Sequence, residues 1–437
     1  MQKKLSLLLK SNLFENISKG LAFQIVSIVA SLVTVPIVLA YLGAEHYGIW
    51  VVIYSVLGIV SSCDLGLPSS FRNLLTNSVA INDTASSKKI VSTCYVSFLL
   101  VSFLILALML IQPLESMSGI YKNMPHQAVL GIVAIALLDY NARLTLIVFT
   151  AHQQSHVMQF GTAITNIIYL ATVSILTMLE IGDENTKLLI IIFTLPFISL
   201  AVNSSVTIYA FTKTFKAVRP SISSFTMIYV KPLFSSGTQF FIIQLCMAVL
   251  GQYSVILIFN LSSGDIVAGL SIYEKYFGIV SILSAALLFP FWSKFGEKYA
   301  LGDYLWIKAT LFKLEIFVAL LSIATFFLWL IFPYVAKVWL PSGEIVLDPI
   351  IGAWVAYKYL AIVINAVYSY LLNGIGKISI QVMGYVVAAL ALPAAAPYLF
   401  EIYGPGGIVA YTGTMYILIA AAQKFYIKTH LMSVAIE

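Results

Sequence analysis

Charged residues are scarce in this sequence. Only 10% of its 437 residues are Asp, Glu, Lys or Arg, whereas 60% are hydrophobic and the mean hydropathy is +0.97. A soluble chain is about a quarter charged, because its surface faces water. The shortage excludes a soluble fold, so lipid must surround most of the chain. The formal net charge of +6 does not indicate nucleic acid as a partner, since Lys and Arg lie in short runs between apolar segments.

Cysteine-rich sites and familiar catalytic motifs are missing too. Three cysteines without a CxxC pattern support neither a disulfide framework nor a zinc site. There is no HExxH, no GxSxG and no glycine-rich phosphate loop with its lysine. His152 and His156 are four residues apart, but no carboxylate pattern completes a metal site. We therefore expect no enzyme, no cofactor and no metal.

Long apolar segments dominate the sequence. A helix crosses the hydrocarbon in about 20 residues, because its backbone groups must bond internally. The sequence predicts twelve such helices, at 17–41, 47–67, 90–112, 127–150, 161–181, 188–211, 233–258, 268–292, 309–332, 349–371, 379–400 and 408–428.

Lys and Arg predict the orientation of these helices. With a cytoplasmic N-terminus, the outer loops hold only Lys122, Lys187 and Lys337. The spans hold Arg143, Lys275 and Lys358, and the other 18 of the 24 basic residues are cytoplasmic. Cytoplasmic loops carry the excess of Lys and Arg, so both termini are predicted in the cytoplasm.

The chain divides near its middle at a polar segment. Residues 212–232 include KTFKAVRPSISS, which predicts a cytoplasmic linker between six-helix bundles at 1–211 and 233–437. The tetrapeptide GIVS occurs at 58–61 and again at 278–281, as expected of duplicated halves. Duplicated halves are common in transporters, with the substrate path between them. The predicted fold is therefore an all-α polytopic membrane protein, with about twelve helices in two bundles around a central cavity.

Charges inside the spans are the strongest functional signal, because each costs about 2.5–3.5 kcal/mol at a helix centre. Asp139 and Arg143 are one helical turn apart, which suits either a structural ion pair or a binding site. Lys358 lies alone in its span, with Asn365 following on the same face, and we expect it to face a water-filled lumen. An interfacial ion pair explains the neighbouring Glu274 and Lys275 nearly as well as a binding site does.

Together these residues predict a path for an anionic substrate. Arg143, Lys275 and Lys358 are the expected cations, and such a path suits a phosphate-bearing molecule. The acids Asp139 and Glu274 are candidates for coupling to H⁺ or Na⁺.

Small and polar residues also form a stripe in the first span. Gly20, Gln24, Ser27, Ser31 and Thr34 recur at spacings of three and four, and therefore share one helical face. The seventh span repeats this pattern through Gly237, Gln244 and Gly251. The stripes indicate either a cavity wall, with Gln24 and Gln244 touching substrate, or close helix packing.

The first hundred residues resemble a known family. The stretches NISKGLAFQIVSIVASLVTVPIVLAYLGAEHYGIW and CDLGLPSSFRNLLTNSVAINDTASSKKIVSTCYV are similar to the N-terminal half of Wzx-type O-antigen flippases. These flippases belong to the polysaccharide transporter branch of the multidrug/oligosaccharidyl-lipid/polysaccharide exporter superfamily. The resemblance is strongest over 12–100, and Pro68-Ser69-Ser70 departs from the glycine-rich stretch expected there.

The resemblance implies an inner-membrane flippase that moves an undecaprenyl-pyrophosphate-linked oligosaccharide to the outer leaflet by alternating access. Its partners would be this lipid-linked oligosaccharide, membrane lipids and other glycan-assembly proteins. Two alternatives stay open. One is a multidrug exporter, or another polysaccharide exporter, of the same architecture. The other is a membrane enzyme, such as an O-antigen polymerase or an acyltransferase, although every predicted outer loop is short for a polymerase.

Overall fold

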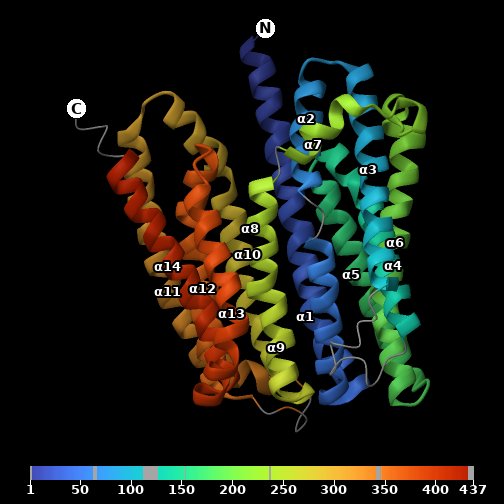
Figure 1. Cartoon of the computed structure of the whole chain (residues 1–437), viewed down its shortest axis with the longest axis vertical. Helices are drawn as coiled ribbons and strands as arrows, with labels where there is room; N and C mark the ends of the chain where they lie inside the picture. The colour runs from blue at the N-terminus through green and yellow to red at the C-terminus, as the bar shows by residue number, and fades with distance from the viewer. Residues whose placement is uncertain are drawn as a thin grey trace. The chain divides into compact units, whose positions relative to one another are not determined.

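The computed structural model describes residues 2–62, 66–111, 126–152, 154–235, 238–340, 345 and 347–431. These residues form helices and connecting turns, with no β-strand among them (Figure 1). Eleven helices in this described part are long and apolar enough to cross a membrane. The all-α polytopic fold predicted from the sequence is confirmed.

The membrane-length helices lie close to the predicted spans. Lipid requires an apolar length, and hydropathy reports that length directly. The helices of the first half are α1 (Gln2–Ser62), α3 (Thr84–Ile111), α4 (His126–Ala151), α5 (His156–Leu179) and α6 (Glu184–Tyr209). In the second half, one span is made of α8 (Thr238–Ala248), the π-helical η6 (Val249–Tyr253) and α9 (Ser254–Leu261). The other helices there are α10 (Gly264–Ala300), α11 (Tyr304–Trp339), α12 (Pro349–Gly374), α13 (Ser379–Tyr403) and α14 (Pro405–Tyr426). Helix α14 continues into the π-helical η7 (Ile427–Leu431).

Helix α1 contains two of the predicted spans. Its apolar part, Ser18–Ser62, has 45 residues, more than twice the length of about 20 residues that one crossing needs. Gly43 interrupts it with φ 72° and ψ 166°, a conformation that glycine tolerates because it has no Cβ. The segments 18–42 and 44–62 each suit one crossing. With the ten other candidates they give the twelve crossings expected from the sequence.

One helix was not predicted. The sequence suggests a polar connection at 68–89, yet α2 (Leu67–Ala80) occupies much of it. Leu67, Phe71 and Leu75 recur at helical spacing and are fully buried against α3 and α4. Hydropathy over a membrane-length window misses so short an amphipathic helix.

The predicted linker is packed rather than extended. It contains η3 (Ala210–Thr214), η4 (Lys216–Val218), η5 (Ile222–Ser224) and the start of α7 (Met227–Ser235). Phe215 and Val218 are buried in the core formed by α2, α3 and α4. The amides of Ser221 and Thr226 donate to the hydroxyls of Ser92 (3.1 Å) and Thr93 (3.2 Å) on α3.

The chain packs into two compact units. The first unit joins Met1–Leu42 to Val60–Phe241, and the second joins Gly43–Ile59 to Ile242–Glu437. In the first unit, α4 and α6 pack along each other and α5 packs on α6. The bundles 1–211 and 233–437 stay a prediction.

The second unit is built around α12. This helix packs between α10 and α14, and its buried face includes Lys358 and Asn365. The second segment of α1 touches α10 in the same unit, where Gly48 meets the backbone of Gly264. A Cβ at either glycine would collide with the facing backbone, so glycine is what allows this approach.

Candidate functional site

Asp139 and Arg143 form the ion pair expected from their spacing on α4. Arg143 Nη2 lies 2.8 Å from Asp139 Oδ2. The carboxylate is buried, with 7% of its side chain exposed, whereas the Arg143 side chain is 51% exposed. The acid is thus held inside the first unit, and the guanidinium reaches its surface.

Helix α6 supplies the other partners of Asp139. Ser199 donates to Asp139 Oδ2 at 2.8 Å, and Asn203 donates to Oδ1 at 2.7 Å. Ser199 also accepts from Arg143 Nη2 at 2.9 Å. Both carboxylate oxygens are therefore bonded, and the cluster links α4 to α6. Sequence reasoning missed Ser199 and Asn203, although two polar residues one turn apart in an apolar span are a readable signal.

The second unit holds a separate acid–base cluster. Glu274 on α10 accepts from Lys358 Nζ on α12 through Oε1, and from the Tyr359 hydroxyl through Oε2 at 2.7 Å. Only 10% of the Lys358 side chain and 20% of the Glu274 side chain are exposed. The cluster joins α10 to α12 as the first cluster joins α4 to α6.

Within its unit, Lys358 has Glu274 and Tyr359 around its ammonium group. The water-filled lumen expected beside it stays a prediction, whereas the expected pairing of Glu274 with Lys275 is corrected. Glu274 pairs with Lys358 rather than with its neighbour Lys275, since consecutive helical residues point in different directions. Lys275 instead lies over the Trp50 ring, 5.9 Å from the ring centre, and has no ion pair among the described residues.

Asn365 belongs to a polar network inside the second unit. It is 3% exposed and accepts from the Tyr385 hydroxyl at 2.7 Å and from Ser369 at 3.1 Å. Its amide donates to the Tyr416 carbonyl at 3.3 Å. The oxygen and the amide nitrogen of the Asn365 side chain therefore both have partners inside the second unit. A role for Asn365 in substrate binding stays a prediction.

Two residues of the polar stripe in the first span contact α5. Ser27 accepts from Asn166 at 2.8 Å, and Gly20 lies beside His156. Close packing therefore explains both positions. Gln24 is half-buried and makes no hydrogen bond to other described residues, and Gln244 is also half-buried. Gly237 of the fainter stripe lies outside the described residues.

A third charged cluster involves Glu315 on α11. Its carboxylate accepts from Lys424 at 2.9 Å and from the Tyr368 hydroxyl at 2.8 Å. The cluster ties α11 to α12 and α14. No group of three His, Cys, Asp or Glu in the described part of the chain is placed to hold a metal.

Comparison with known proteins identifies the fold. No family model and no curated protein sequence matches the chain. The chain is similar to the inward-facing structure of a multidrug resistance MATE family transporter of the MOP superfamily, with a TM-score of 0.76 and 12% identity over 96% of this chain and 99% of that one. It is also similar to a point mutant of the Vibrio cholerae MATE transporter VcmN, with a TM-score of 0.67 and 13% identity over 97% and 98%. An outward-facing MATE family transporter gives a TM-score of 0.61 and 13% identity over 98% and 96%. The chain therefore has the MATE transporter fold.

Proposed function

We propose that the chain is an alternating-access transporter that exports an amphiphilic substrate and couples export to H⁺ or Na⁺. The main support is a pair of acid–base clusters, one in each compact unit, each built on a carboxylate that is largely buried between two helices. Each lies in a fold that similar transporters adopt in inward- and outward-facing structures. The distribution of Lys and Arg supports cytoplasmic termini and an inner-membrane location.

The clusters suit ion coupling because each holds a carboxylate between two helices. A buried charge in a membrane protein is expensive and persists when partners compensate it. A proton or a sodium ion on Asp139 would compete with Arg143, Ser199 and Asn203, and so would change the contact between α4 and α6. Ion binding at Glu274 would change the contact between α10 and α12 in the same manner. Ion occupancy would thereby bias the conformation of each unit.

Two substrate classes fit. The names of the similar solved structures favour a drug-like amphiphile, since they are multidrug transporters. The sequence resemblance over 12–100 favours an undecaprenyl-pyrophosphate-linked oligosaccharide. Lys275 supports the glycolipid, because it is a cation without an acidic partner among the described residues and lies on an aromatic ring. The comparisons support multidrug export better than glycolipid export.

One genetic experiment separates the substrates. The chain is expressed in a bacterium that lacks its own O-antigen flippase and its own drug exporters, and surface glycan and ethidium resistance are measured. Restored glycan supports the lipid-linked oligosaccharide, and resistance without glycan supports multidrug export. Asp139→Asn should abolish whichever activity appears while the membrane level of protein stays normal, and so should Glu274→Gln when it is combined with Lys358→Met, which avoids leaving an unpaired buried charge. Asp303→Asn, outside the spans, is the matched control and should remain active.

Two results would overturn the proposal. One is an absence of both activities together with no pH- or Na⁺-driven ethidium transport in vesicles that contain the wild-type protein. The other is full activity in the Asp139→Asn, Glu274→Gln double variant, which would show that neither carboxylate is needed for coupling.

A further inference from the structure

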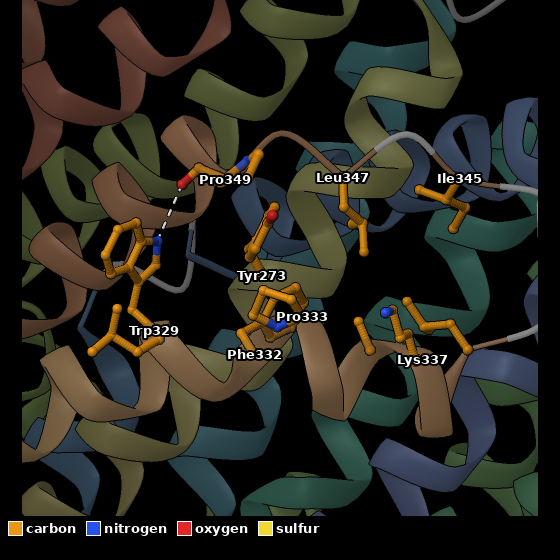
Figure 2. Close-up of a pocket in the computed structure, with 11 residues that line it drawn as sticks. Tyr273, Trp329, Phe332, Pro333, Lys337, Ile345, Leu347 and Pro349 are labelled. Atoms are coloured by element: carbon orange, nitrogen blue, oxygen red, sulfur yellow. Dashed lines mark hydrogen bonds between the residues drawn. The ribbon is translucent and has the colours of Figure 1, made fainter.

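The second unit contains a cavity that the two charged clusters do not use. Its volume is about 530 Å³, within the range of small-molecule sites. Residues of α10 and α11 line it together with Ile345, Leu347 and Pro349 (Figure 2). Most of its lining is apolar, including Phe332, Pro333, Leu340, Ile345 and Leu347.

The walls of this cavity are held in place by packing and by a hydrogen bond. The Tyr273 and Phe332 rings lie 4.6 Å apart between centres. Trp329 Nε1 donates to the Pro349 carbonyl at 3.1 Å, which fixes α11 to the first residue of α12 (Figure 2). Gly352 leaves the room that the Tyr273 ring occupies, because a Cβ there would collide with the ring.

Two hydrogen-bond donors interrupt the apolar lining. Tyr273 is only 2% exposed, yet its hydroxyl has no hydrogen-bond partner among the described residues (Figure 2). Because Tyr273 lines the cavity, its hydroxyl is available to donate to an acceptor on a ligand there. Lys337 also lines the cavity and forms no ion pair with a described residue. Apolar walls with a cation and a hydroxyl match an anionic amphiphile.

The position of the cavity along α11 indicates which anionic amphiphile can reach it. Its α11 residues run from Trp329 to Lys337, and Trp329 is ten residues, or about 15 Å, before the end of the helix at Trp339. By helix rise, Lys337 lies about 12 Å nearer to the end of α11 than Trp329, on the side where lipid headgroups would be expected. Membrane phospholipids are the anionic amphiphiles available there.

We propose that this cavity binds an anionic phospholipid. One acyl chain occupies the space between Trp329, Phe332 and Leu347. The phosphate accepts from Lys337 Nζ and from the Tyr273 hydroxyl. The site is independent of the exported substrate, because it uses none of the residues of the two charged clusters.

Native mass spectrometry of the full chain tests the assignment, with phosphatidylglycerol, phosphatidylcholine and palmitate as probes. Lys337→Gln removes the cation, and Tyr273→Phe removes only the hydroxyl. We expect Lys337→Gln to lower phosphatidylglycerol affinity about tenfold, as for loss of a charged hydrogen bond. Ala336→Trp, which fills the cavity, should lower binding of both phospholipids. Lys308→Gln, at the other end of α11, is the matched control and should bind as the wild type does.

The outcomes decide the proposal. Equal phosphatidylglycerol binding by Lys337→Gln and Lys308→Gln would overturn it. Palmitate binding that exceeds phosphatidylglycerol binding would assign the cavity to a free fatty acid and would also overturn it. If Ala336→Trp fails to fold, Tyr273→Phe decides instead, because a loss of phosphatidylglycerol affinity of about threefold or more supports the site and an unchanged affinity rejects it.

Discussion

Lys358 and Glu274 form an ion pair although 84 positions separate them in the sequence. The pair joins α12 to α10 where both helices are buried, and the Tyr359 hydroxyl bonds the second carboxylate oxygen at 2.7 Å. Removing one member leaves the other as an uncompensated charge, which costs more than the intact pair contributes.

Lys358→Met should therefore destabilise the protein strongly. We expect a loss of about 3–5 kcal/mol, because Glu274 would remain buried without its cation. Adding Glu274→Gln should restore most of the stability. Thermal unfolding of the purified protein in detergent measures both effects. Lys275→Met is the control, since Lys275 has no ion pair among the described residues. Equal unfolding midpoints for Lys358→Met and Lys275→Met would contradict the importance of the pair.

Ser199→Ala should loosen the contact between α4 and α6. The hydroxyl accepts from Arg143 and donates to Asp139, so its loss leaves a buried carboxylate oxygen short of one donor. We expect a destabilisation of about 1–3 kcal/mol and slower ion-driven transport. Ser205→Ala on the same helix is the comparison, because that exposed hydroxyl bonds only the Ala201 carbonyl of its own helix. Equal unfolding midpoints and equal transport rates for Ser199→Ala and Ser205→Ala would contradict this role of Ser199.

The start of α11 should depend on pH through Asp303. A hydrogen bond from Lys298 and one from the Trp306 backbone amide lower the pKa of this carboxyl below its usual 3.8. A lowered folded-state pKa stabilises the fold at pH values above the usual pKa, and the gain disappears as the pH falls through the lowered value. Hydrogen exchange of the first turn of α11 should thus be faster in Asp303→Asn than in the wild type at about pH 6, well above the usual pKa. The difference should shrink below about pH 3.9. A difference that stays undiminished after the pH has fallen well below the lowered pKa would exclude the carboxylate as its cause.

Much of the fold was predictable because lipid imposes a simple requirement. Each crossing needs an apolar helix of fixed length, so each span was found, with its ends within eight residues of the observed helix ends apart from the start of α1. The Asp139–Arg143 pair was predictable for a similar reason, since both partners lie on one helix at a spacing that brings them together. The short helix α2 escaped notice because it is amphipathic and too short for a membrane-length window to detect.

Partners on different helices were not predictable. Nothing local in the sequence connects Glu274 to Lys358, or Glu315 to Lys424, because each pairing depends on how helices pack. The cavity beside Lys337 could not be predicted for the same reason, since residues of α10, α11 and the start of α12 line it. The stripe at Gly20 and Ser27 was visible, but only the packed structure shows that α5 covers both residues.

The contact between Gly48 and Gly264 has a mechanical consequence. Backbone lies directly on backbone there, with no side chain between that could rearrange to follow a movement. Residues 44–59 and α10 must consequently shift together as one piece. Gly43, where the chain passes from one unit to the other, has the glycine-favoured torsion angles φ 72° and ψ 166°. Any residue with a Cβ at position 43 would therefore strain the backbone at this junction without touching a charged group.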